Sequence, residues 1–299
     1  MKEKRRSVDL TTGPIWKRLL VYFLPILAGS LFQQLYTTVD AVILGQFAGK
    51  TGLAAIDSVY SLLKLPVNFF IGLSTGATIM ISQRFGAKDE ESLSRAVHTG
   101  MGFALAGGLL LSIAGVIIAP MCLDAMRVPD EIRELALGYV RIYFGGLFLN
   151  LLFNIGSGIL RAVGDSRTPF LILIVAGVAN IALDLVFVAW LKLNAAGAAL
   201  ATVISQGLSA ALILRVLARA KAAYRLDLKQ LSFDGSVLKN IFRLGLPIGF
   251  QSAMFPMSLL ENAAYLGLPV PDKLREILSQ LHDRDKKEGS NETDVGGGE

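Results

Sequence analysis

The stretch TPFLILIVAGVANIALDLVFVAWL, residues 168–191, decides the fold class of this chain. Asp184 is its only charged residue. A helix needs ~20 mostly apolar residues to cross ~30 Å of hydrocarbon. The stretch is therefore predicted to span a membrane and to carry a carboxyl group into the apolar layer.

The rest of the chain has the same character. Hydrophobic residues make up 53% of the 299 residues and charged residues 18%, whereas soluble domains carry about 25% charge. Five further apolar runs cover about Ile15 to Leu44, Leu53 to Ile81, Leu93 to Ala119, Ile132 to Leu160 and Ala195 to Leu217. We predict an all-α polytopic membrane helix bundle with six transmembrane helices and a truncated seventh.

The seventh apolar run begins near Ile241, and Pro256 interrupts it. Its Leu246-Pro247-Ile248 repeats Leu24-Pro25-Ile26 of the first run, as expected for transporters built from symmetric halves. The predicted organisation is a six-helix lobe over 1–218, a cytoplasmic linker over 219–240, a partial seventh helix over 241–260 and a polar tail over 261–299 with a disordered end.

The formal net charge of +5 comes from basic residues at the ends of apolar runs. Such residues orient membrane helices, so a nucleic-acid partner is not expected. With the amino terminus inside, the outer loops hold only Lys50, Arg127, Arg133 and Lys192. We therefore expect a multi-pass protein of the cell membrane, embedded in the lipid bilayer, with its amino terminus in the cytoplasm.

Asp40 lies in the first apolar run, and Gln33, Tyr36 and Asp40 share one helix face. A charged residue at mid-bilayer costs at least ~2.5–3.5 kcal/mol, so it is expected to face protein or a water-filled cavity. The alternative is that Asp40 is solvated near the outer headgroups, since it lies four residues from Leu44.

Asn180 and Asp184 lie four positions apart in the middle of the fifth run, on one face. A carboxyl group there is either protonated or paired with a cation, and oxygen ligands suit a hard cation such as sodium. The alternative is a hydrogen bond between packed helices. Thr202 of the sixth run, taken alone, is interpreted as structural, because threonine commonly bonds its own helix backbone.

Pro25 and Pro66 predict kinks in the first and second helices. Gly156 and Gly158 are expected to allow close helix contact, and Gly164 to allow a turn.

No Walker pattern, hydrolase triad or metal-spaced Cys and His cluster occurs, and His98 is interpreted as structural. The chain is therefore not expected to be an enzyme. It is expected to need no cofactor and no metal beyond a coupling ion.

Three motifs resemble a known family. They are LFQQLYTTVD with AVILG over 31–45, GILRAVGD with SRTP over 158–169, and NIALD over 180–184. Over about residues 10 to 255 the chain resembles the amino-terminal half of multidrug and toxin extrusion (MATE) transporters.

The resemblance implies two six-helix lobes around a central cavity, and export of drugs or organic cations against inward sodium or proton flow. It implies a cation site formed by Asp40, Asn180, Asp184 and Thr202. The polar stripe of Gln33, Gln34 and Tyr36 is expected to line the substrate cavity, and Pro25 to let the first helix bend.

The chain departs from the family's twelve-helix pattern, and its tail resembles that of phage-type holins. One hypothesis is a cation-coupled antiporter that acts as a half-transporter, with a homodimer as its expected assembly. The alternatives are a non-transporting truncated or fused membrane protein, or a flippase-like carrier of lipid-linked oligosaccharides.

Overall fold

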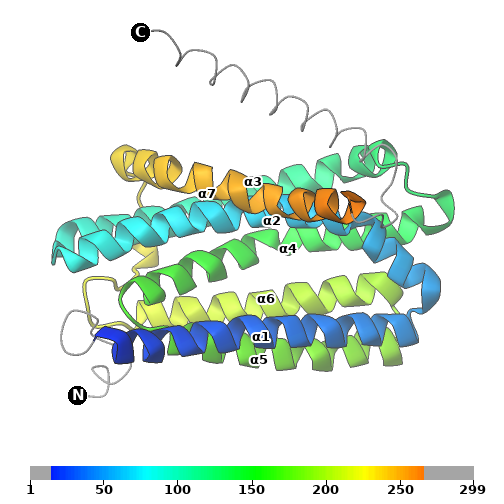
Figure 1. The fold of residues 1–299 in the computed structure, drawn as a ribbon, viewed down its shortest axis with the longest axis horizontal. Coiled ribbons are helices and arrows are strands. Elements are labelled where there is room, and N and C mark those ends of the chain that lie inside the picture. Colours follow the sequence, from blue (N-terminus) through cyan, green and yellow to red (C-terminus); the bar gives the residue numbers. More distant parts are fainter. Residues whose placement is uncertain (1–14, 266–299) are drawn as a thin grey trace, which may run out of the picture.

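The computed structural model describes residues 15–265, which form helices joined by short loops, without a strand in that range (Figure 1). The helices are α1 Ile15–Phe47, α2 Gly49–Gly86, α3 Glu90–Ala125, α4 Asp130–Ala162, α5 Arg167–Asp184, the π-helix η2 Leu185–Trp190, α6 Asn194–Ala218, the 3-10 turn η3 Leu228–Gln230 and α7 Gly235–Tyr265. Six of them are long and apolar enough to cross a membrane. The predicted all-α membrane bundle is thereby confirmed, while the tail beyond 265 lies outside the described residues.

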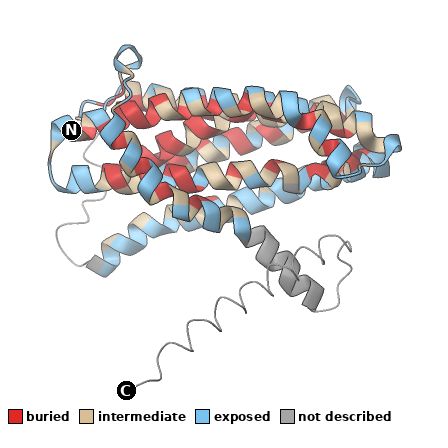
Figure 2. Ribbon diagram, turned by 90° about the horizontal axis from the view of Figure 1, so that it is seen from above, coloured by how far each residue is buried: buried red, intermediate tan, exposed pale blue. Residues whose placement is uncertain are grey.

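Helix α4 lies in the middle of the bundle, with α2, α3 and α6 packed around it. Its inward face is fully buried, as at Val140, Leu147 and Ile159. Large apolar side chains such as Leu110 and Ile117 are exposed on the outside, and Figure 2 shows buried residues concentrated within the bundle. Outward apolar and inward close-packed faces are what a lipid environment favours.

Small residues set the distances between the helices. A Cβ at Gly156 would lie 2.8 Å from Ile213 Cγ1, and one at Gly158 would overlap the Thr78 side chain. Gly164 has φ +89° in the turn between α4 and α5. These positions confirm the close contacts and the turn predicted from the sequence.

Helix α7 crosses α2 where both helices have glycines four positions apart, at Gly72 and Gly76 and at Gly245 and Gly249. A Cβ at Gly76 would lie 2.6 Å from Gly245 Cα, and one at Gly72 would overlap the Gly249 backbone. Backbones approach this closely only where side chains are absent. The crossing is therefore fixed by four glycines.

Helix α7 is longer than the sequence predicted. It begins at Gly235 rather than 241 and continues past Pro256 to Tyr265. The early start has a local cause, since Asp234 Oδ1 accepts hydrogen bonds from Ser236 N at 2.8 Å and Ser236 Oγ at 2.6 Å. This carboxylate caps the helix and satisfies amides that would otherwise lack a partner.

The two predicted kink positions lie inside continuous helices, Pro25 in α1 and Pro66 in α2. Figure 1 shows the first, blue part of α2 running at an angle to its cyan remainder. A bend in α2 therefore agrees with the sequence, while the bending of α1 at Pro25 stays a prediction.

The linker between α6 and α7 is bonded to α3 near the beginning of that helix. His98 Nδ1 donates to Ser94 O at 2.7 Å, so its Nε2 is free to accept from Asp227 N at 3.1 Å. Thr99 Oγ1 accepts from Asp234 N at 3.3 Å. His98 is thus structural, as predicted, and its partner lies 129 positions away.

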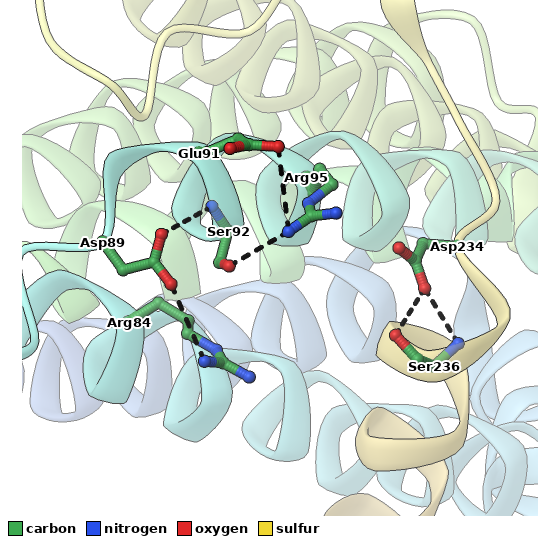
Figure 3. A network of polar contacts seen from close by, with 7 residues as sticks. All are labelled: Arg84, Asp89, Glu91, Ser92, Arg95, Asp234 and Ser236. Carbon is green, nitrogen blue, oxygen red and sulfur yellow. Dashed lines mark hydrogen bonds and ion pairs between the residues drawn. The ribbon is translucent and has the colours of Figure 1, made fainter.

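Charged side chains surround this attachment on the outside of the bundle (Figure 3). Asp89 caps α3 by accepting from Ser92 N at 3.1 Å and lies 3.9 Å from Arg84. Arg95 lies 3.9 Å from Glu91. Such exposed pairs contribute little to stability, so the backbone bonds to His98 and Thr99 position the linker.

The glycine crossing predicts that Gly72→Ala destabilises the protein. The new methyl group meets the Gly249 backbone, and overpacking of this kind costs about 1–3 kcal/mol. The matched control is Gly138→Ala, where a Cβ meets nothing within 4 Å and the helix gains about 0.5–1 kcal/mol. Thermal unfolding in detergent should give a lower midpoint for Gly72→Ala and an unchanged or higher one for Gly138→Ala. Equal midpoints would contradict the crossing.

The cap of α7 should weaken in acid. Hydrogen bonds from the Ser236 side chain, then from the Val237 and Ser236 amides, hold the pKa of Asp234 below its ordinary value of 3.8. A lowered folded-state pKa means that the cap is fully effective above that ordinary value and is lost as pH falls through the folded-state pKa. Amide exchange at residues 236–239 should therefore accelerate in acid in the wild type relative to Asp234→Asn. Asparagine caps almost as well and does not titrate, so an equal pH response in both would refute the role of the carboxylate.

Candidate functional site

The structure brings Asp40 of α1 and Asp184 of α5 together inside the bundle. The two carboxyl groups are close enough to interact electrostatically. Asp184 has no exposed surface and Asp40 is partly buried. Asp40 Oδ1 is thus buried rather than solvated, while the depth of Asp40 in the membrane stays a prediction.

Several polar atoms here lack hydrogen bonds of good geometry. Among the described residues, Asp40 Oδ1, both carboxyl oxygens of Asp184 and Asn180 Nδ2 are buried without a partner. The ion pairs found in the described part of the chain include neither acid. Buried polar groups normally have hydrogen-bond partners. The atoms of this cluster lack them, so they are available to bind a ligand.

A fixed register between α1 and α5 creates the pair. Tyr22 O accepts from Ser166 Oγ at 2.8 Å, and these residues lie 144 positions apart in the chain. Tyr22 also donates its hydroxyl to Arg161 O at 3.1 Å. Because both helices rise equally per residue and run in the same direction, the same offset places Asp40 beside Asp184.

Gly177 lets the two helices approach at the level of the site. A Cβ there would lie 2.6 Å from Phe32 Cε1 and 3.4 Å from Tyr36 Cδ1. Sequence reasoning did not single out Gly177. Its spacing to Asn180 and Asp184 places it on their helix face, and that signal could have identified it.

The backbone widens immediately after Asp184. Residues Leu185–Trp190 form a π-helix, in which Leu191 N donates to Val186 O at 2.8 Å. Single π turns inside α-helices are frequent at functional sites. Asp184 is thus the last residue of the regular helix α5, at the point where the helix geometry changes.

Tyr139 of α4 joins the site and Tyr143 packs against it, and sequence reasoning missed both. Tyr139 interacts electrostatically with Asp40 and Asp184. Tyr143 stacks on Tyr139 with ring centroids 6.1 Å apart. The two tyrosines lie four positions apart, which is the same spacing that revealed Asn180 and Asp184.

A second line of polar contacts leads away from the acids. Tyr143 lies beside Gln206 of α6, whose Oε1 is buried without a hydrogen bond among the described residues. Tyr60 of α2 interacts with both α4 tyrosines. Lys64 Nζ lies 5.2 Å from the Tyr60 ring centroid, so this cation contacts an aromatic face and forms no ion pair with the described acids.

Thr202 donates its hydroxyl to Ala198 O at 2.9 Å, within its own helix. This is the backbone bond expected of a structural threonine. Its oxygen retains lone pairs that could contribute to a cation site. Membership of Thr202 in the site stays a prediction.

Gln33 and Gln34 are exposed on the outside of α1, whereas Tyr36 is partly buried against Gly177 and lies near Asp40. The helix face bearing the two glutamines is thus open to whatever lies beside this lobe. A role of these residues in a substrate cavity stays a prediction.

Membrane-spanning helices around a buried pair of acids define a multi-pass membrane protein with a polar intramembrane site. A family model described as MatE matches residues 25–186. The chain belongs to the MatE family, which comprises membrane transporters rather than enzymes.

Relatives and solved structures agree with this family. The Bacillus subtilis protein named "Probable multidrug resistance protein YoeA" is 31% identical over 84% of this chain and 56% of its own length. The Listeria monocytogenes protein named "Probable multidrug resistance protein NorM" is 29% identical over 86% and 58%. An outward-facing multidrug resistance MATE family transporter of the MOP superfamily matches with a TM-score of 0.75 and 27% identity, over 82% of this chain and 54% of that structure. The chain spans about half the length of the curated relatives that it matches.

The register predicts that Gly177→Val separates the acids. The added methyl groups would displace Phe32 and Tyr36, so α1 would move away from α5. A pair of cysteines introduced at positions 40 and 184, in a Cys122→Ala background, should form a disulfide readily when Gly177 is retained and poorly in the Gly177→Val variant. Gly207→Val is the matched control, because a Cβ there meets only Leu149, at 3.5 Å. Equal cross-linking in all three proteins would rule out the proposed role of Gly177.

Proposed function

We propose that this chain is one lobe of a cation-coupled antiporter that exports drugs or organic cations, with Asp40 and Asp184 holding the coupling cation. The observation that supports this most strongly is the acid pair itself. Two adjacent carboxyl groups in an apolar bundle either hold a proton or, if both are ionised, need a cation between them. A site of this kind exchanges protons or sodium as its surroundings change.

The remaining ligands follow from the geometry. Asn180, one turn before Asp184, would offer its amide oxygen, and Thr202 its hydroxyl oxygen, which gives the all-oxygen set preferred by sodium. Tyr139 would donate its hydroxyl to an ionised carboxylate and so stabilise the site when it is empty. Proton and sodium are therefore the two coupling ions to be tested.

Coupling would work through charge. Binding of the ion lowers the negative charge of the acid pair, and loss of the ion restores negative charge that favours an organic cation nearby. The ion pairs in the described part of the chain leave both acids out, so an anionic cargo such as a lipid-linked sugar phosphate is disfavoured. Movement of α1 against α5 at Gly177 would link the site to the face that bears Gln33 and Gln34.

A central cavity between two lobes needs a second lobe beside this one. A second copy of the chain is one source, which gives a homodimer of half-transporters. The orientation follows from charge. The beginning of α1 and the loops after α2, α4 and α6 lie at the same end of the bundle (Figure 1), and the basic residues there favour the cytoplasmic side.

The test combines transport with proton release. In vesicles with an imposed sodium or proton gradient, Asp40→Asn and Asp184→Asn should each lower fluorescent cation uptake by about tenfold or more, the loss expected when ~1.4 kcal/mol of ion binding is removed. Asp57→Asn, which removes an exposed carboxylate of α2, should leave uptake unchanged. Unaltered uptake in the Asp40 and Asp184 variants would refute the coupling site.

Proton release reports on the site without a second lobe. Addition of sodium or an organic cation to the purified protein in weakly buffered detergent should release protons from the wild type and from Asp57→Asn. The Asp40→Asn, Asp184→Asn double variant should release none. Equal release from all three proteins would contradict the assignment, and so would none from the wild type.

A further inference from the structure

An apolar groove lies between α1 and α5 near the beginning of both helices. Its volume is about 470 Å³. It is lined by Leu20, Val21, Leu24 and Ala28 of α1 and by Phe170 and Leu171 of α5. Leu24 and Leu171 are more than half exposed, so the groove opens outward rather than into the acid site.

The depth of the groove matches one leaflet of a bilayer. Trp16 is 62% exposed. The Nζ atom of the neighbouring Lys17 lies 5.4 Å from the centroid of the Trp16 ring. Tryptophan and lysine in this position mark the headgroup level. Ala28 lies twelve residues further along α1, which is ~18 Å at 1.5 Å per residue, close to half of a ~30 Å hydrocarbon core.

The rim of the groove at the headgroup level is basic. Arg167 lines the groove and is exposed, and Lys17 is exposed one helical turn before Leu20. The nearby acid, Asp165, is buried, and both its oxygens accept bonds from Thr168, at 2.9 Å and 2.6 Å. None of the ion pairs in the described part of the chain includes Arg167 or Lys17.

We propose that this groove binds one anionic phospholipid, with an acyl chain along α1 and α5 and the phosphate group at Arg167 and Lys17. An apolar groove with two exposed cations at one end matches the shape and charge of such a lipid. Basic pockets between membrane helices bind acidic headgroups in this manner. The site is separate from the acid pair and does not depend on transport.

The two tryptophans of the chain provide the measurement. Trp16 lies one helical turn before Leu20 of the groove, and Trp190 ends η2, which follows α5. Because α1 and α5 begin at the same end of the bundle (Figure 1), Trp190 lies far from the groove. Trp190→Phe leaves Trp16 as the reporter, and Trp16→Phe leaves Trp190 as the control. Each protein is reconstituted in bilayers that contain brominated phosphatidylglycerol or brominated phosphatidylcholine, whose bromine quenches tryptophan fluorescence on contact.

Trp16 should be quenched preferentially by the brominated phosphatidylglycerol, with a preference on the order of fivefold for each basic residue involved. Trp190 should show no preference. Arg167→Gln should remove most of the preference at Trp16, and Arg167→Lys should retain it. Arg127→Gln, which removes an exposed cation at the opposite end, should have no effect at Trp16.

Three results would overturn the proposal. The first is equal quenching of Trp16 by both lipids. The second is an undiminished preference in Ala28→Phe, which fills the groove, since headgroup attraction alone would then explain the result. The third is no quenching of Trp16 by either lipid, which would mean that a second copy of the chain or another protein covers the groove.

Discussion

The structure depends on the cost of placing two carboxyl groups in an apolar bundle. Asp184 is fully buried and Asp40 partly so, and each would be expensive alone in hydrocarbon. Protein surroundings lower that cost when groups that can share a proton or a cation lie next to each other. The pairing of α1 with α5 brings them together, and Tyr139 of α4 adds a hydroxyl group near the pair.

Helix contacts in a membrane gain little from the hydrophobic effect, because lipid tails are as apolar as leucine. Helix association therefore relies on close packing, which small residues at the contacts allow. Gly177 admits Phe32 and Tyr36, and the glycines of α2 and α7 admit each other's backbones. The packing of α1 against α5 therefore depends on the position of Gly177. The distance between the two acids depends on it as well.

The two ends of the α1 and α5 pair have different chemistry. Further along the two helices the pair encloses acids whose oxygens lack hydrogen-bond partners, which suits a cation. At its beginning it carries exposed Lys17 and Arg167 over an apolar groove, which suits an acidic headgroup. Both features come from the same two parallel helices, so a change in their packing is expected to affect both.

The sequence by itself determined the six membrane helices, their approximate ends and the intramembrane acids, because hydropathy and the cost of buried charge act locally along the chain. It also singled out Asp40, Asn180 and Asp184 as candidates. Only the tertiary structure decided that Asp40 lies near Asp184, that Tyr139 joins them, and that Gln33 and Gln34 are exposed. These outcomes depend on helix register and on glycine contacts between segments more than a hundred residues apart, which no local pattern encodes.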